Sequence, residues 1–376
     1  MSSALRIAVA QVHPPTADVA GALARLRWLL AAVRAAGAAD LLVLPECWLQ
    51  AYHLRPELAR RLAVPLGGAD EDAGGDDVGA IAVIRALAKE FAVAVALGLA
   101  ERCACGCGAV YNTLALVGAD GALVGAYRKT HLWGDAEREA FCPGPSAAAA
   151  AASPEARARC RAPPQPAAFA PLRLPGFPRV PIGLLVCFDL EFPEPARILA
   201  LAGARLVLAS VAMGEREAFA SRVFARARAC ENHIGIVYAN FPSSEPPAPA
   251  EPALAGLVCA PAPRYSGGSC VVGPDGSVLH ALPAYARPGE GGRNATQPGA
   301  SSERLDSAAT AAVHAALLAG GAGGDAAAPS SLGFDEHVFV VRFDPDEAEF
   351  AADAARNPYL EQRRRDLYGL GPGRRD

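Results

Sequence analysis

The alternation of short apolar runs with longer amphipathic segments constrains the fold of this chain more than any other feature of its sequence. The short runs are rich in aliphatic residues and are typical of β-strands. They occupy residues 6–11, 41–44, 92–97, 112–117, 182–186, 206–210 and 234–239. Helical patterns lie between several of them, at residues 19–35, 78–91, 195–202 and 215–232. Because the strand-like runs are apolar almost throughout, they predict an α/β protein whose sheets are buried on both faces.

A few stretches break this alternation, because Ala, Pro, Gly and Ser dominate them and few large apolar residues could anchor them. Such composition predicts surface insertions or disordered loops. Strand-like sequence resumes afterwards, at residues 269–272 and 338–343. We therefore expect one domain over residues 1–376, with a core over about residues 4–370 that insertions interrupt. The predicted insertions are residues 147–168, 242–263 and 287–331.

Composition excludes several classes of protein. The net charge of -4 and the pI near 6.0 leave no excess of basic groups for binding nucleic acid. No apolar run is long enough to cross a membrane, and residues 3–11 enter a strand pattern without the features of a secretory signal. We therefore expect a cytoplasmic protein that acts on a small molecule, with most of its 10 cysteines as free thiols.

The segment from Ile182 to Glu194 is the most informative in the chain. An apolar strand delivers Cys187 to a turn, and Pro193 suits the first turn of the helix that follows. A thiol in this position would face a cleft, and the backbone N–H of Phe188 could point at a developing negative charge. The alternative interpretation, and the commoner fate of a cysteine, is a small buried apolar side chain.

Two further strand ends carry a carboxylate and an ammonium. Glu46 follows an apolar strand and Pro45, where burial would raise its pKa toward the range of a general base. Lys129 ends a strand-like stretch that begins near Ala122, and it could bind an oxyanion. Taken alone, each is more often a solvated residue, Glu46 at a strand end and Lys129 in a turn. Together with Cys187, however, they provide a base, a cation and a nucleophile for covalent amide hydrolysis.

These segments resemble the nitrilase, or carbon-nitrogen hydrolase, superfamily, whose pattern is a Glu, a Lys and a Cys in this order. The wordings Tyr-Arg-Lys-Thr-His-Leu-Trp-Gly and Cys-Phe-Asp-Leu-Glu-Phe-Pro-Glu are similar to those of its amidase branches. The resemblance implies catalytic roles for Glu46, Lys129 and Cys187. It also suggests Glu137 as the second glutamate often found near this triad. Tyr52, in an Ala-Tyr pair where many relatives have Gly-Tyr, is implied as a pocket residue.

The resemblance extends over residues 5–368 apart from the predicted insertions. Further matches are the helix that ends in Glu231-Asn232, the strand that ends in Asn240, and the hairpin after Ser266. The fold implied is an αββα sandwich, in which two sheets pack face to face with helices outside. The resemblance also implies a homodimer or larger homo-oligomer, and a reaction that needs no metal and no organic cofactor.

The expected reaction is hydrolysis of a small amide through a cysteine thioester, with Lys129 and the Phe188 N–H holding the oxyanion. The same residues could process a nitrile or an N-carbamoyl amine. His131 is an alternative base. A non-enzymatic alternative is an interaction module in which catalysis is vestigial, although such a module has no reason to retain the triad.

A metal-binding interpretation starts from the clustered thiols of Cys103, Cys105 and Cys107. Structural zinc sites usually separate paired ligands by two residues and add a second pair elsewhere, and no second pair stands out. We therefore expect no metal site, and interpret the segment as a thiol-bearing hairpin loop between two strands.

Overall fold

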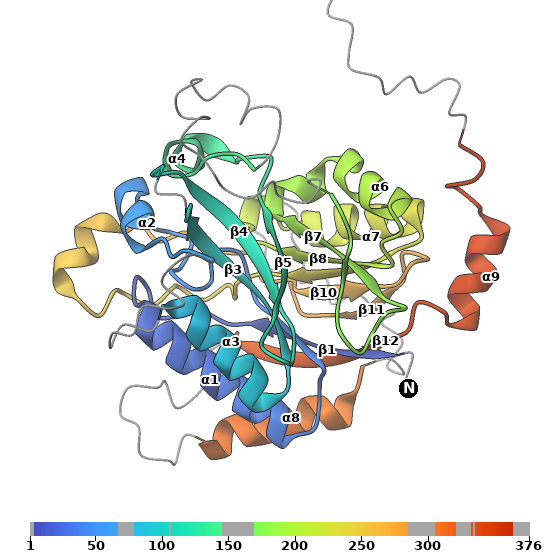
Figure 1. Ribbon diagram of the computed structural model, residues 1–376, viewed down its shortest axis with the longest axis horizontal. Helices are drawn as coiled ribbons and strands as arrows, with labels where there is room; N and C mark the ends of the chain where they lie inside the picture. Colours follow the sequence, from blue (N-terminus) through green and yellow to red (C-terminus); the bar gives the residue numbers. More distant parts are fainter. Residues whose placement is uncertain are drawn as a thin grey trace, which may run out of the picture.

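A computed structural model describes residues 4–66, 79–104, 107–144, 169–284, 305–320, 332–333 and 335–363. The described residues form two six-stranded sheets with helices on their outer faces. Figure 1 shows α1, α3 and α8 below the first sheet and α6 and α7 over the second. This arrangement is the predicted αββα sandwich, and the predicted fold class is confirmed.

The first sheet has the strand order β12-β1-β2-β3-β4-β5. Its strands β1, β2 and β3 are parallel, whereas β12 and the β3-β4-β5 meander pair in antiparallel fashion. The strands are β1 (Leu5–Gln11), β2 (Leu41–Val43), β3 (Ala94–Arg102), β4 (Val110–Val117), β5 (Leu123–Arg128) and β12 (His337–Phe343).

The second sheet has the order β11-β10-β9-β8-β7-β6. Its centre, β7 to β9, is parallel and its edges are antiparallel. The strands are β6 (Leu172–Arg173), β7 (Pro181–Val186), β8 (Leu206–Ser210), β9 (Gly235–Ala239), β10 (Cys270–Val272) and β11 (Val278–Ala281).

The helices lie in the connections between strands and after the last strand, β12. Asp18 caps α1 through a hydrogen bond from Gly21 N, and Pro193 opens α6 as the sequence predicts. In the described part of the chain they are α1 (Val19–Ala35), α2 (Pro56–Leu62), α3 (Ala80–Phe91), α4 (Gly134–Ala140), α6 (Pro193–Leu201), α7 (Ala220–Asn232), α8 (Ser307–Gly320) and α9 (Ala348–Arg356). Shorter 3₁₀ segments are η2 (Cys187–Glu191), η3 (Glu215–Glu217) and η4 (Pro252–Leu257).

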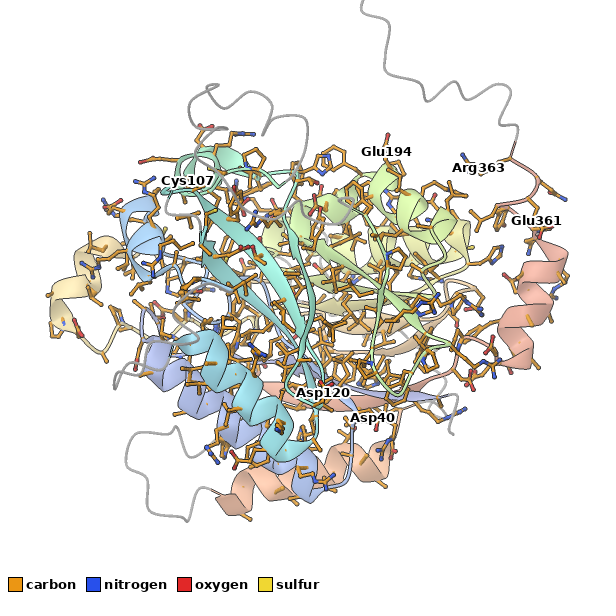
Figure 2. The ribbon with its side chains drawn as sticks, in the orientation of Figure 1. Asp40, Cys107, Asp120, Glu194, Glu361 and Arg363 are labelled. Atoms are coloured by element: carbon orange, nitrogen blue, oxygen red, sulfur yellow. The ribbon has the colours of Figure 1, made fainter. Side chains whose placement is uncertain are left out.

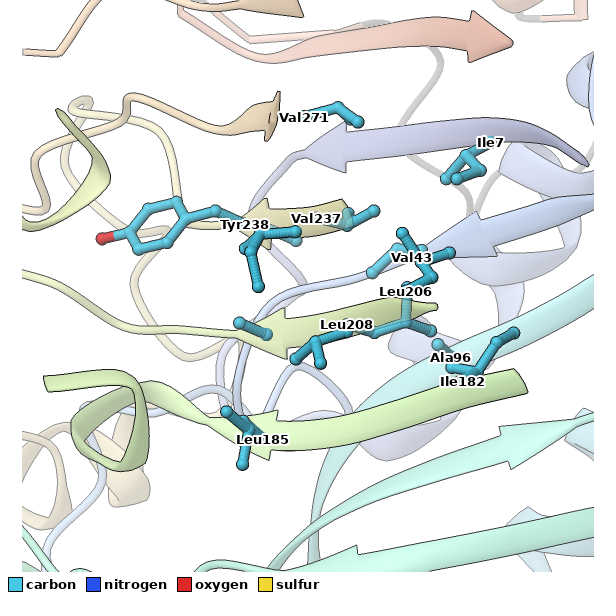
Figure 3. Close-up of a cluster of buried hydrophobic side chains, with 14 of the residues drawn as sticks. Ile7, Val43, Ala96, Ile182, Leu185, Leu206, Leu208, Val237, Tyr238 and Val271 are labelled. Atoms are coloured by element: carbon cyan, nitrogen blue, oxygen red, sulfur yellow. The ribbon is translucent and has the colours of Figure 1, made fainter. Parts of the chain in front are cut away.

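The two sheets bury an aliphatic layer between them. Figure 3 shows side chains of both sheets in this layer, among them Ile7, Val43 and Leu208. Alternation along β4 sends Leu114 into this layer, whereas Ala115 packs under the helices that cover the first sheet. Because side chains alternate between the two faces, the position of a residue along its strand decides whether its side chain points between the sheets.

The third predicted insertion contains α8, so residues 307–320 form a helix and the disordered-loop alternative is wrong there. Ala is the strongest helix former, Asp306 accepts a hydrogen bond from Ala309 N at 2.8 Å, and Val313 and Leu317 are buried on one helix face. Few large side chains are needed, because Val313 and Leu317, four residues apart, anchor α8 beside α1.

The second predicted insertion, residues 242–263, is a loop that contains η4. Its end is hydrogen-bonded to the start of α2, through Arg55 N to Leu257 O at 2.9 Å and Cys259 N to His53 O at 2.8 Å. The first predicted insertion, residues 147–168, lies outside the described residues, as do residues 287–304 and 321–331 of the third.

The loop that joins β3 and β4 contains Cys103 and Cys107, in the predicted position between two antiparallel strands. Cys105 lies outside the described residues. Within the described ranges, no group of three or more His, Cys, Asp or Glu side chains could hold a metal ion. No helix in these ranges combines the length and the apolar character needed to span a membrane.

Candidate active site

The candidate residues follow strands of both sheets. Glu46 comes after β2, Lys129 directly after β5, and Cys187 directly after β7. Figure 2 labels Asp40, just before β2, and Asp120, in the turn before β5, in the lower half of the view. They mark the opposite ends of two of these strands. Because the sheets stack face to face, chain ends from both can meet at one edge of the layer between them.

Lys129 joins the two glutamates. Its Nζ donates hydrogen bonds to Glu46 Oε1 and to Glu137 Oε1, each at 2.7 Å. Tyr52 Oη donates to the same Glu137 oxygen at 2.6 Å, and Trp133 N donates to Glu137 Oε2 at 2.8 Å. The Glu46 and Lys129 side chains are fully buried, with 0 % of their surface exposed. The structure thus brings together four of the residues named from the sequence.

Asn112, which sequence analysis used only as the start of a strand, belongs to this cluster. Its Nδ2 donates to Glu46 Oε1 at 2.7 Å, and its backbone oxygen accepts from Lys129 N at 2.8 Å. An amide side chain at the head of an otherwise apolar strand was the signal that could have identified it. The second carboxylate oxygen of Glu46, Oε2, is buried and has no hydrogen-bond partner among the described residues.

Cys187 lies at the first position of η2, with φ of 48°, in the left-handed region that a side chain usually avoids. Its thiol is buried, is hydrogen-bonded by the backbone of Ala212, and interacts electrostatically with Glu46 and Lys129. The nucleophile candidate therefore lies beside the base and cation candidates. Phe188 follows in η2 and its ring packs against Phe192, with centroids 5.0 Å apart.

Burial controls the protonation of the cluster. It raises the pKa of Glu46 to about 7, against the opposing effect of the Lys129 ammonium. Burial, reinforced by the Glu46 carboxylate, raises the pKa of the Cys187 thiol well above its usual value. Burial also acts to lower the pKa of Lys129, but the two carboxylates outweigh it and hold this pKa well above its usual value. Near neutral pH, the arrangement is an ammonium, a thiol and a carboxyl group close to its titration point.

Asp189 is a second residue that sequence analysis did not single out. Its carboxylate accepts hydrogen bonds from Tyr127 Oη at 2.9 Å, Thr130 Oγ1 at 2.8 Å and His131 N at 3.0 Å. His131 Nδ1 lies 2.7 Å from the same carboxylate. Asp189 therefore links the turn that carries Lys129 to the turn that carries Cys187. It also holds the His131 ring next to its own carboxylate.

The Glu46 turn depends on a glycine in the neighbouring strand. A Cβ atom on Gly98 would lie 2.4 Å from Pro45 O and 2.7 Å from Glu46 Cα. Leu49 N donates to Gly98 O at 3.1 Å, which holds the turn against β3. Only a residue without a side chain lets the backbone that carries Glu46 approach so closely.

Behind the thiol, Asn240 at the end of β9 organises the loop that follows β8. Its Oδ1 accepts from Met213 N at 3.0 Å, and its Nδ2 donates to Gly267 O at 2.8 Å. Ser269 Oγ donates to Gln11 Oε1 at 2.9 Å and accepts from Asn240 N at 3.0 Å. This network fixes the loop whose Ala212 backbone contacts Cys187.

An αββα sandwich that buries a thiol, an ammonium and two carboxylates at one edge defines a nitrilase-like hydrolase. The sequence profile of the carbon-nitrogen hydrolase family matches residues 6–287. The chain belongs to this family and is a hydrolase of carbon–nitrogen bonds, which confirms the predicted class.

Curated relatives include the "Hydrolase in pqqF 5′ region" of Pseudomonas protegens, which is 34% identical over 73% of this chain and 78% of its own length. The "(R)-stereoselective amidase" of a Pseudomonas species is 30% identical over 73% of this chain and 80% of its own length. Among solved structures, a variant of the amidase from Nesterenkonia sp. AN1 in complex with acrylamide has a TM-score of 0.60. It is 24% identical, with 97% of this chain and 96% of that chain covered, and it supports the fold.

Proposed function

We propose that this protein is an amidase that converts a small amide into a carboxylic acid and ammonia or an amine through a thioester on Cys187. The observation that carries the proposal is the buried contact of Lys129 with Glu46 and Glu137 beside the Cys187 thiol. A relative described as an amidase supports the choice of amides. In a mutant of the structurally similar Nesterenkonia amidase, acrylamide undergoes Michael addition at the active-site cysteine, which supports a thiol nucleophile.

Acylation starts when Glu46 accepts the thiol proton and the sulfur of Cys187 attacks the amide carbonyl carbon. The carbonyl electron pair moves to oxygen, where the Lys129 ammonium and the Phe188 N–H stabilise the oxyanion. The electron pair then re-forms the carbonyl and breaks the carbon–nitrogen bond. Glu46 gives its proton to the departing nitrogen, so that ammonia or an amine leaves and a thioester remains.

Deacylation repeats these steps with water as the nucleophile. Glu46 accepts a proton from the water molecule while the water oxygen attacks the thioester carbon. Collapse of the second tetrahedral intermediate breaks the carbon–sulfur bond and releases the acid, and Glu46 returns its proton to the Cys187 sulfur. Glu137 and Tyr52 hold Lys129 in place through the Glu137 carboxylate. Glu46 passes on each proton that it accepts, first from the thiol to the leaving nitrogen and then from water to the sulfur, and no metal or organic cofactor takes part in a step.

The test is ammonia release from a panel of amides, nitriles and N-carbamoyl amines by the wild type and by Cys187→Ala. Cys270→Ala is a matched control, because Cys270 is another buried thiol whose pKa burial raises to about 12. We expect release from amides by the wild type and the control but not by Cys187→Ala, and an acyl group on Cys187 in mass spectra of the quenched enzyme. Activity that survives Cys187→Ala would exclude the thioester route. Release from nitriles or N-carbamoyl amines alone would select the corresponding alternative substrate.

We also propose that residues 1–376 work as one cytoplasmic domain and that the chain forms a homodimer or larger homo-oligomer. A reducing compartment keeps the nucleophilic thiol free. Exposed apolar side chains on the outer helices support pairing of subunits, namely Ile198 and Leu201 on α6, Val223 on α7, and Phe219 just before α7. Light scattering of the wild type and of Val223→Glu tests this, since a monomeric wild type would exclude the proposal.

A further inference from the structure

A cavity of about 400 Å³ lies next to the candidate active site. Its wall comes from the turn after Glu46, from α4, and from residues 259–263 of the loop that the sequence predicts as an insertion. Tyr52 and Glu137 line this cavity and also belong to the hydrogen-bonded cluster around Lys129. Through these two side chains the cavity borders the proposed reaction site.

The buried polar side chains Glu137 and Gln50 in the wall are already hydrogen-bonded. The charged Asp135 lies at the solvent-exposed rim, where it pairs with Arg138 at 3.0 Å. Both Glu137 oxygens accept hydrogen bonds, and the Gln50 side chain bonds the backbone of Ala100 in both directions. Burial lowers the pKa of His53 to about 4, so its ring is neutral near pH 7. A charged or strongly polar ligand group in the buried part of the cavity would lose its hydration, and the Glu137 and Gln50 side chains there are already hydrogen-bonded.

The rest of the wall is mainly apolar. It includes Leu54, Ala140, Phe141 and Pro261. Trp133, directly before α4, also contributes, although 50% of its surface is exposed. A large aromatic side chain left half-exposed at the wall of an apolar cavity is typical of a small-molecule binding site.

We propose that this cavity binds the apolar substituent of the amide substrate, and that α4 and residues 259–263 select substrates by the length of that substituent. The inference rests on the proposed amidase function and names its substrate class, namely amides with an uncharged chain of several carbons. Sites of about 300 to 1,000 Å³ typically hold whole drug-sized molecules. Because a water molecule occupies about 30 Å³, acetamide would displace only a few waters and leave the cavity almost empty.

The wall formed by residues 259–263 is held in place by its own backbone contacts. Val258 pairs with Leu54 in an antiparallel bridge, and Cys259 N donates to His53 O at 2.8 Å. Both partners in the turn after Glu46 line the cavity. A segment that the sequence marks only as an insertion thus becomes part of the substrate-selecting surface.

The test compares hydrolysis of acetamide, butanamide and hexanamide by the wild type, Ala136→Phe and Glu139→Phe. Both are exposed residues of α4, but Ala136 lines the cavity and Glu139 lies outside its wall. For the wild type, kcat/KM should rise about fourfold for each buried methylene group. Ala136→Phe should lower kcat/KM for hexanamide by about tenfold or more and leave that for acetamide within about twofold. Glu139→Phe should behave as the wild type.

A second measurement separates binding from turnover. In Cys187→Ala, hexanamide should change the fluorescence of Trp133, the most exposed of the three tryptophans, whereas acetamide should not. The double variant Cys187→Ala/Ala136→Phe should lose this change. Amide hydrolysis that does not depend on chain length would overturn the cavity assignment and leave the amidase proposal intact. A Trp133 response to hexanamide without hydrolysis of any amide by the wild type would support the binding site and overturn the amidase proposal.

Discussion

Neighbouring residues on β4 and at the end of β5 build two buried charge clusters on opposite faces of the first sheet. Asn112 and Lys129 point between the sheets and hydrogen-bond Glu46. The next residue on β4 and the preceding residue on β5, Thr113 and Arg128, point to the other face and hydrogen-bond Glu101. The strand pleat alone separates the clusters, because successive side chains alternate between the faces.

In the Glu101 cluster both carboxylate oxygens have hydrogen-bond partners. Arg128 Nε donates to Glu101 Oε2 at 2.9 Å, and its Nη2 contacts Oε1. The guanidinium also lies over the Tyr111 ring, 3.9 Å from its centroid. The Glu46 cluster, by contrast, leaves Oε2 without a hydrogen-bond partner in the described part of the chain, and it lies beside a thiol. A carboxylate whose two oxygens are both hydrogen-bonded serves as a structural ion pair, as at Glu101. A carboxylate with an unbonded oxygen, as at Glu46, can accept a proton.

The largest expected effect distinguishes the two cations. Lys129→Met and Arg128→Met should each destabilise the fold by about 3 to 5 kcal/mol, because each leaves a carboxylate buried without its cation. Only Lys129→Met should abolish ammonia release. Urea unfolding measures the loss of stability, and the ammonia-release assay measures the loss of activity. Loss of turnover in folded Arg128→Met would break the division into a reactive and a structural cluster.

Replacing the carboxylates sharpens the division. Glu46→Gln should lower kcat by about 10²- to 10⁴-fold, since an amide cannot accept the thiol proton. Glu101→Gln should keep kcat within a few-fold and lose stability, by about 3 kcal/mol, because it weakens a buried pair. Steady-state kinetics and chemical denaturation of both variants measure this. Equal loss of kcat in the two variants would argue against Glu46 as the base.

The pH dependence of turnover should report Glu46. Because the base must be ionised to accept a proton, kcat/KM should fall about tenfold per pH unit below the Glu46 pKa of about 7 and level off above it. The rate profile between pH 5 and 9, measured with an uncharged amide, checks the direction. An activity that is flat across pH 7 would show that another group governs the thiol.

The smallest effect compares Asn112 with Thr113. The hydrogen bond from Asn112 lowers the pKa of Glu46, so Asn112→Ala should raise it and move the acidic limb of the profile to higher pH, by about one unit. Thr113→Val should leave the limb in place, because Thr113 contacts Glu101 instead. A limb that moves in both variants would indicate a general loosening of β4.

Sequence analysis located Glu46, Lys129 and Cys187 because each directly follows a recognisable apolar strand or its closing turn. It did not locate Asn112 or Asp189, because a polar residue beside a strand is usually solvated and only its neighbours in space reveal a role. Helix α8 was missed for a related reason, since Val313 and Leu317 gain significance only by packing beside α1.

The sequence by itself determined the alternation of strands and helices and the three chemical groups that follow strand ends, because hydrophobic periodicity is a local property of the chain. The sandwich class came from the resemblance of its motifs to those of a known family. Only the tertiary structure decided which groups meet, which carboxylate stays incompletely bonded, and which loop closes the cavity beside Tyr52. These features depend on contacts between residues far apart in sequence, such as Lys129 with Glu46, and on the burial that raises the Glu46 pKa to about 7.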